Sequence, residues 1–208
     1  MHKLFFFVLT FLLFSCNDKK IFLPLADTTI LSEVQDHSPV YIFFKTNKND
    51  TLAEVNRKNT ISSTNWIFNI DKRLPLKLVV PEIIKLQEKK SSSAHKNEES
   101  QNYYSYSDSV HQNLAFLSFT KVKYAFVKPN AKRGVILFFN KENALFVNNV
   151  PVKKEDLRAY LASQKSEEYV LCFDKNASYQ SYLGNKIWLE TIQKSNPRFV
   201  FSNEECVF

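Results

Sequence analysis

Glycine is nearly absent from this sequence, which has only 2 glycines among its 208 residues. They are Gly134 and Gly184, so the chain has no glycine-rich loop that could cradle a phosphate group. Histidine is scarce as well, and His95 and His111 lie far apart in a polar segment without a neighbouring thiol. No nucleophile has a base beside it, and the acidic residues are scattered. We therefore expect no catalytic residues, no metal site and no cofactor.

Long hydrophobic runs are also missing, apart from one at the N-terminus. Residues 4–14 form an uncharged apolar run behind Lys3, too short to cross a bilayer and typical of a signal peptide. The run ends in Leu-Phe-Ser-Cys at Cys16, which resembles the lipobox of bacterial lipoproteins. The resemblance implies a signal peptide over residues 1–16, with lipid attached to Cys16 at its end. The alternative is an ordinary cleaved signal peptide in which Cys16 occurs by chance.

A lipid on Cys16 would place the protein in the bacterial cell envelope. The lipid would hold it on the inner or the outer membrane, with the soluble part in the periplasm or on the cell surface. Residues 17–39 are polar at first and then mixed, with two prolines, and this composition predicts a tether between lipid and fold.

The net charge is +7, from 28 basic and 21 acidic residues. The basic residues are dispersed in pairs such as Lys89 and Lys90, which is typical of a solvated surface. Nucleic-acid binding needs a focused basic stripe, so we expect no nucleic-acid partner. An anionic lipid or a cell-wall polymer is a better match for any basic face.

The chain has 3 cysteines, of which Cys172 and Cys206 remain if Cys16 is lipidated. An exported protein occupies an oxidising compartment, where these two could form a disulfide. The alternative is a pair of buried, reduced thiols that fill the core.

Hydrophobic periodicity predicts an α+β fold. Strand-like runs occupy residues 40–44, 51–55, 66–70, 114–119, 122–127, 135–139, 144–147, 169–173 and 198–208, and helical patterns occupy 76–90, 151–163 and 182–192. Residues 91–113 are polar and predict a long exposed loop. Residues 128–134 are basic and turn-rich, and predict a linker between a first unit at 40–127 and a second at 135–208.

The two halves resemble each other in sequence. The run Ile-Phe-Phe at 42–44 and the run Leu-Phe-Phe at 137–139 are each followed by a turn and a second strand. Later in each half a strand ends at an aspartate, Asp71 or Asp174, and a helix follows. The pattern predicts two small hairpin-helix-strand-helix units, a degenerate tandem repeat whose first copy has lost a helix. Each aspartate is expected to accept hydrogen bonds from the helix start.

Residues 135–193 resemble the periplasmic domain of the ExbD/TolR family of biopolymer-transport proteins. The family pattern of two strands ending in Val-Asn, a Pro-Val step, a helix, a strand ending in Asp and a second helix is matched here through Asn148 and Asp174. The first half matches only in part, at Asp71. The resemblance implies a domain that dimerises and binds the cell wall or envelope proteins. Family members that conduct protons have a carboxylate in a transmembrane helix, and residues 4–15 contain none, so a proton-conducting role is excluded.

These observations predict a non-enzymatic lipoprotein that docks on a transport or envelope-spanning apparatus, or on peptidoglycan. A homodimer could form through an exposed edge strand, with residues 200–208 as the candidate. The alternative is a surface-exposed lipoprotein in adhesion, gliding or uptake.

Overall fold

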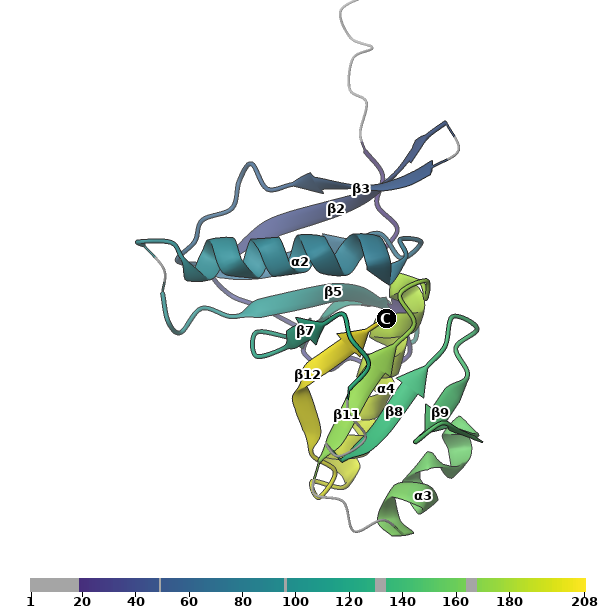
Figure 1. Ribbon diagram of the computed structural model, residues 1–208. Helices are drawn as coiled ribbons and strands as arrows, with labels where there is room; N and C mark the ends of the chain where they lie inside the picture. The colour runs from purple at the N-terminus through teal and green to yellow at the C-terminus, as the bar shows by residue number, and fades with distance from the viewer. Residues whose placement is uncertain (1–18, 49, 96, 130–133, 164–167) are drawn as a thin grey trace, which may run out of the picture.

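The structure is a computed structural model that describes residues 19–208 except 49, 96, 130–133 and 164–167 (Figure 1). In chain order, the elements of the first part are β1 (Leu25–Ala26), β2 (His37–Asn47), β3 (Asp50–Asn56), β4 (Asn65–Ile70), α2 (Leu76–Ser91), β5 (Asn102–Asp108), β6 (Asn113–Ser118) and β7 (Lys123–Ala125). The later ones are β8 (Val135–Phe139), β9 (Leu145–Val147), β10 (Val150–Val152), a 3-10 turn η2 (Lys154–Asp156), α3 (Leu157–Ser163), β11 (Tyr169–Phe173), α4 (Tyr179–Ser195) and β12 (Phe201–Val207). None of the helices in these ranges is both long enough and apolar enough to span a membrane.

Six strands, β1 to β6, form the first sheet, in the order β1-β5-β4-β2-β3 with β6 also paired to β5. β2 and β3 form an antiparallel hairpin, while β4 runs parallel to both β2 and β5. In β2, Val40 and Ile42 are fully buried and Tyr41 between them is half-buried, because successive residues face opposite sides of a strand. Figure 1 shows α2 lying along this sheet.

The second sheet has the order β10-β9-β8-β11-β12-β7. β8 and β9 are antiparallel, and β11 runs parallel to β8 on one side and to β12 on the other. β11 pairs with a strand on each side and is buried at every position. α4 packs on this sheet, where the ring of Tyr182 meets that of Phe173 at 4.8 Å between centroids.

One hydrophobic core joins the two sheets. At the seam, Tyr104 of β5 stacks on Phe119 and makes edge contacts with Tyr179 and Tyr182 of α4, at 5.7 and 6.2 Å between centroids. Aromatic rings bury large apolar areas, so this cluster contributes strongly to holding the halves together.

The predicted pair of hairpin-helix-strand-helix units is wrong. The described chain is dominated by two mixed six-stranded sheets, with three α-helices. In the first half the predicted loss of the helix between the hairpin and β4 is seen, but three further strands, β5, β6 and β7, follow α2. The fold is a sheet-rich α+β structure rather than a tandem repeat of helix-containing units.

The polar segment 91–113, predicted as a loop, contains the strand β5. Tyr104 and Tyr106 are fully buried in it, and Ser105 is buried because its hydroxyl donates to Phe68 O at 3.2 Å and to Asn69 Oδ1 at 2.8 Å. Polar residues can enter a core when their hydrogen bonds are satisfied, which composition alone does not reveal.

The predicted borders of the units also differ from the structure. β7 belongs to the predicted first unit but pairs with β12 of the second sheet. Residues 19–39, predicted as a tether, are instead attached to the two-sheet fold. β1 pairs with β5, Phe22 N donates to Asp71 Oδ2, and β2 begins at His37. Most of the predicted linker, at 130–133, lies outside the described residues.

The start of α2 is stabilised by the second half of the chain. Its N-cap, Pro75, makes no side-chain capping bond. Instead, Leu76 N donates to Ala177 O at 3.0 Å and Lys77 N to Lys175 O at 2.8 Å. Two first-turn amides that lack partners within the helix are therefore satisfied from the other half.

The start of α4 is stabilised in the same way by the first half. Tyr179 N donates to Leu74 O at 2.8 Å and Gln180 N to Lys72 O at 3.0 Å, while the N-cap Ser178 accepts from Ser181 N. Each long helix thus begins on the turn that precedes the other.

Candidate functional site

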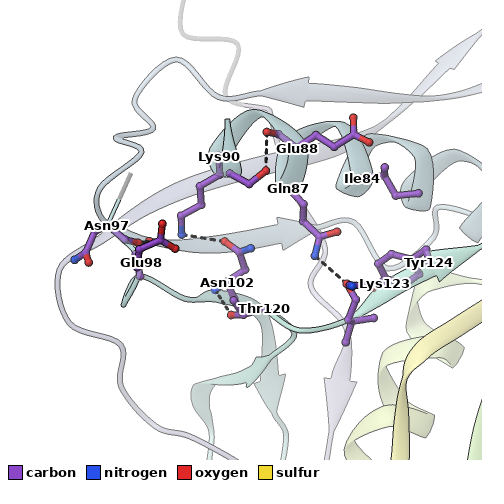
Figure 2. Close-up of a pocket in the computed structure, with 13 residues that line it drawn as sticks. Ile84, Gln87, Glu88, Lys90, Asn97, Glu98, Asn102, Thr120, Lys123 and Tyr124 are labelled. Carbon is purple, nitrogen blue, oxygen red and sulfur yellow. Dashed lines mark hydrogen bonds between the residues drawn. The ribbon is translucent and has the colours of Figure 1, made fainter. Parts of the chain in front are cut away.

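A pocket of about 440 Å³ opens between α2, residues 97–102 and residues 120–124 (Figure 2). It lies at the seam between the sheets, because α2 covers the first sheet and β7 belongs to the second. Its lining mixes apolar side chains with charged and amide side chains, a combination that small-ligand sites share.

Lys90 is the central polar residue of this pocket. Only 6% of the surface of this residue is accessible to solvent. Its Nζ donates to Gln101 O at 3.0 Å and to Asn102 Oδ1 at 3.1 Å. Figure 2 shows the side chain running from α2 to Asn102. The ammonium also lies 5.3 Å from the ring centroid of Trp66. Within the described part of the chain, Lys90 forms no ion pair with a carboxylate.

Burial lowers the pKa of Lys90 to about 8, because removing an ammonium from water disfavours its charged form. Lys90 lies in the last turn of α2, where the helix dipole favours a cation. At neutral pH the group is therefore mostly a buried ammonium, held by carbonyl oxygens and an aromatic ring rather than by a counter-ion.

The walls of the pocket are fixed by hydrogen bonds. Asn102 N donates to Thr120 Oγ1 at 2.7 Å, and Gln87 Nε2 donates to Val122 O at 3.2 Å. These bonds tie the end of α2 and the start of β5 to residues 120–122, so the pocket is formed by hydrogen-bonded segments.

Tyr124 connects the pocket to a buried chain of hydroxyl groups. Its hydroxyl bonds to that of Tyr104 and, at 2.9 Å, to that of Tyr182. Tyr182 in turn donates to Glu205 Oε2 at 2.8 Å, and Glu205 forms an ion pair with Lys186. Burial raises the pKa of Tyr104, Tyr124 and Tyr182 well above the ordinary tyrosine value, so all three are neutral donors.

A second cavity, of about 600 Å³, lies along α4 beside β1 and η2. Lys154 lines it and donates to Asn185 Oδ1 at 2.6 Å, and the buried Asn185 donates to Asn143 Oδ1 at 2.7 Å. Lys154 is only half-buried, and its surroundings already satisfy Asn185. The Lys90 pocket is the stronger candidate because its ammonium is buried.

Asp71 and Asp174, predicted from the family pattern, lie where β4 and β11 end, but neither caps a helix, since the N-caps are Pro75 and Ser178. Asp71 is fully buried and accepts from Arg73 Nε and Nη2, both at 2.8 Å. Asp174 Oδ1 accepts from the backbone N of Asn176, two residues on, at 2.8 Å. Both therefore stabilise turns.

Asn148, the third family-pattern position, has a φ of 48° in the turn between β9 and β10. It exchanges two hydrogen bonds of 2.9 Å with the backbone of Ile136. Asparagine tolerates this left-handed conformation better than most residues, which accounts for it in this turn.

Cys172 and Cys206 are direct partners on the parallel strands β11 and β12. Both side chains are buried, and the pKa of the Cys172 thiol is raised first by its hydrogen bond with Cys206 and then by burial. The disulfide stays a prediction, as does the lipid site, because Cys16 lies outside the described residues.

Sequence reasoning missed Lys90, which it treated as part of a solvated lysine pair. The signal was present: Leu86 and Ile83 are buried on α2, and position 90 continues their spacing on the same helix face. In the described ranges, no three His, Cys, Asp or Glu residues gather in a way that could hold a metal ion. No protein-family model, curated protein or solved structure matched this chain.

Proposed function

We propose that this chain is a lipid-anchored, non-enzymatic protein of the bacterial cell envelope that docks on a partner at the membrane surface. The partner would be a component of a transport or envelope-spanning apparatus, or peptidoglycan close to the membrane. Cys16 would carry the lipid, and the two-sheet body would carry the docking surface.

The attachment of residues 19–26 to the body is the observation that carries the proposal. Lys19 forms an ion pair with Glu54 of β3, and Leu25 exchanges two hydrogen bonds with the Gln180 side chain, at 2.9 and 2.8 Å. Lys19 is only three positions after Cys16, and three residue steps span about 10 Å even when fully extended. A lipid on Cys16 would therefore hold the body against the membrane, which favours a membrane-bound partner.

The edges of the sheets are the candidate docking surfaces. The prediction that residues 200–208 form an exposed edge is wrong, because β12 pairs with β11 on one side and with β7 on the other. β3 ends the first sheet and has 7 residues, whereas β7 and β10 at the ends of the second sheet have 3 each. A strand of a partner, or of a second copy of this chain, would find the longest of these edges at β3.

Lipid labelling in the native bacterium tests the anchor. Wild-type protein should incorporate labelled palmitate and remain in the membrane fraction. Cys16→Ser should lose the label, whereas Cys172→Ser, a control with an intact Cys16, should keep it. Labelling of Cys16→Ser at the wild-type level would refute the anchor.

Crosslinking in the same cells tests the docking role. We expect membrane-bound transport or envelope subunits, or peptidoglycan fragments, to be recovered with the wild-type protein. The variant Ala53→Pro changes the edge strand β3. It should reduce recovery of these partners if they pair with the β3 edge, because proline removes a backbone hydrogen-bond donor. Recovery of surface proteins alone would contradict docking and support the alternative roles in adhesion, gliding or uptake.

Uptake or sensing of a small molecule is the second candidate function. The Lys90 pocket favours it, since a buried ammonium in a cavity of about 440 Å³ can hold a ligand.

A further inference from the structure

We propose that the pocket at the end of α2 binds a small organic anion with a single carboxylate group, which the Lys90 ammonium holds. This inference goes beyond the docking role and does not depend on the lipid anchor.

The first argument is the incomplete pairing of a buried charge. An ammonium has three N–H donors, and Lys90 uses two of them on Gln101 O and Asn102 Oδ1. Both acceptors are neutral, and burial without a counter-ion costs free energy. A carboxylate placed at the third donor would complete the hydrogen bonding and neutralise the charge.

The second argument is the charge of the lining, which selects the anion. Among the described lining residues, the charged ones besides Lys90 are Lys123, Glu88 and Glu98, whose formal charges sum to one negative charge. With Lys90 protonated these described residues are neutral overall, so they offer no excess positive charge to a dianion such as phosphate. A singly charged carboxylate matches the single buried ammonium.

The third argument is the apolar wall. Ile84 and Val122 line the same cavity as Lys90, together with Tyr124. Figure 2 shows Ile84 and Tyr124 on the side of the pocket away from Lys90. A ligand with its carboxylate at Lys90 can therefore extend an apolar body toward these side chains, where burial of apolar surface stabilises binding.

Titration calorimetry of the mature protein tests the proposal, with N-acetyl-leucine as the monocarboxylate and inorganic phosphate as the dianion. We expect N-acetyl-leucine to bind with a dissociation constant of about 1 mM or below, and phosphate to bind at least tenfold more weakly. Lys90→Met should weaken N-acetyl-leucine binding at least tenfold, because a charge-assisted hydrogen bond is lost. Lys89→Met, which changes the exposed neighbour on the same turn, should bind as the wild type does.

A pH series on the wild-type protein keeps the test independent of variant folding. Binding of N-acetyl-leucine should weaken as the pH rises above about 8, where Lys90 loses its proton. The proposal is overturned by absence of N-acetyl-leucine binding, by phosphate binding of equal strength, by unchanged affinity in a folded Lys90→Met, or by affinity that is constant through this pH range.

Discussion

Tyr182 donates its hydroxyl hydrogen to Glu205 Oε2 across 2.8 Å, and both side chains are almost completely buried. The pair lies at the seam between the sheets, where Tyr124 of β7 extends the chain of hydroxyl groups toward the pocket. A buried carboxylate depends on its partners, because each one lost leaves a desolvated charge less well compensated.

Tyr182→Phe should lower the free energy of unfolding by about 1–3 kcal/mol, because Glu205 then loses a buried donor. Tyr179→Phe is the matched control on the same helix, since the buried Tyr179 hydroxyl forms no hydrogen bond. Removing it should leave stability unchanged or raise it slightly. Urea unfolding monitored by circular dichroism measures both, and equal losses in the two variants would contradict the role of the network.

Lys186→Met should be more damaging, with a loss of about 3–5 kcal/mol, because it leaves the Glu205 carboxylate without its cation. Lys194→Met changes an exposed lysine of the same helix and should cost less than about 1 kcal/mol. The same unfolding experiment separates the two variants. A Lys186→Met protein as stable as Lys194→Met would contradict a stabilising role for this ion pair.

Asp71 should make the protein sensitive to acid. Burial alone would raise the pKa of this carboxyl, but hydrogen bonds from the Arg73 side chain and from two backbone amides outweigh it and hold the pKa below its ordinary value. The unfolded chain therefore takes up the proton first as the pH falls. The stabilisation is complete above the ordinary aspartate pKa of about 4 and is lost below it.

Asp71→Asn should flatten this loss between about pH 5 and pH 2. It should also cost about 1–3 kcal/mol at pH 7, because hydrogen bonds to a charged group are lost. Thermal unfolding at a series of pH values measures both effects. Equal slopes in the wild type and the variant would contradict the assignment.

The alternation and helical spacing of the sequence predicted most strands and the positions of the long helices. They failed where polar residues are buried, at Ser105 of β5, and where strands pair across the halves, at β7. The local hydrophobic pattern indicates which side of a segment is buried. The pairing of strands depends instead on contacts between residues far apart in the chain, which the local pattern does not contain.

The candidate site was harder to predict than the fold. Asp71, Asn148 and Asp174 were noticed because they end strands or occupy turns, and the structure places them in turn-stabilising contacts. Lys90 stood beside another lysine, and charge alone suggested solvent. Only its helical phase relative to Leu86 indicated burial.

Lys90 should also make the stability depend on pH, but for a different reason from Asp71. The fold favours the charged form of Asp71, whereas it disfavours the charged form of Lys90. Its folded-state pKa of about 8 lies below the ordinary lysine value of 10.5, so between these values the unfolded chain binds more protons. The free energy of unfolding should therefore rise with pH above 8, by at most about 3 kcal/mol over the full window. Lys90→Met should lack the rise and Lys89→Met should keep it, measured by urea unfolding from pH 7 to 9.5.

Cys172 and Cys206, if reduced, should be inert to a thiol reagent in the folded protein and reactive in denaturant. Both are buried, and the raised pKa of Cys172 keeps it protonated. Mass spectrometry after alkylation with and without urea counts the labelled thiols. Protein isolated from its native cells that stays unlabelled in urea until a reductant is added would instead show the disulfide.

The crossed hydrogen bonds at the starts of α2 and α4 have a mechanical consequence. The two sheets meet through four backbone bonds between Leu76, Lys77, Tyr179 and Gln180 and the opposite turns, and through the aromatic rings behind them. Tilting one sheet against the other would break these bonds together, so the body should transmit a force without bending. A partner that pulls on the β3 edge would pull on the whole molecule and, if Cys16 carries a lipid, through residues 17–18 on the membrane.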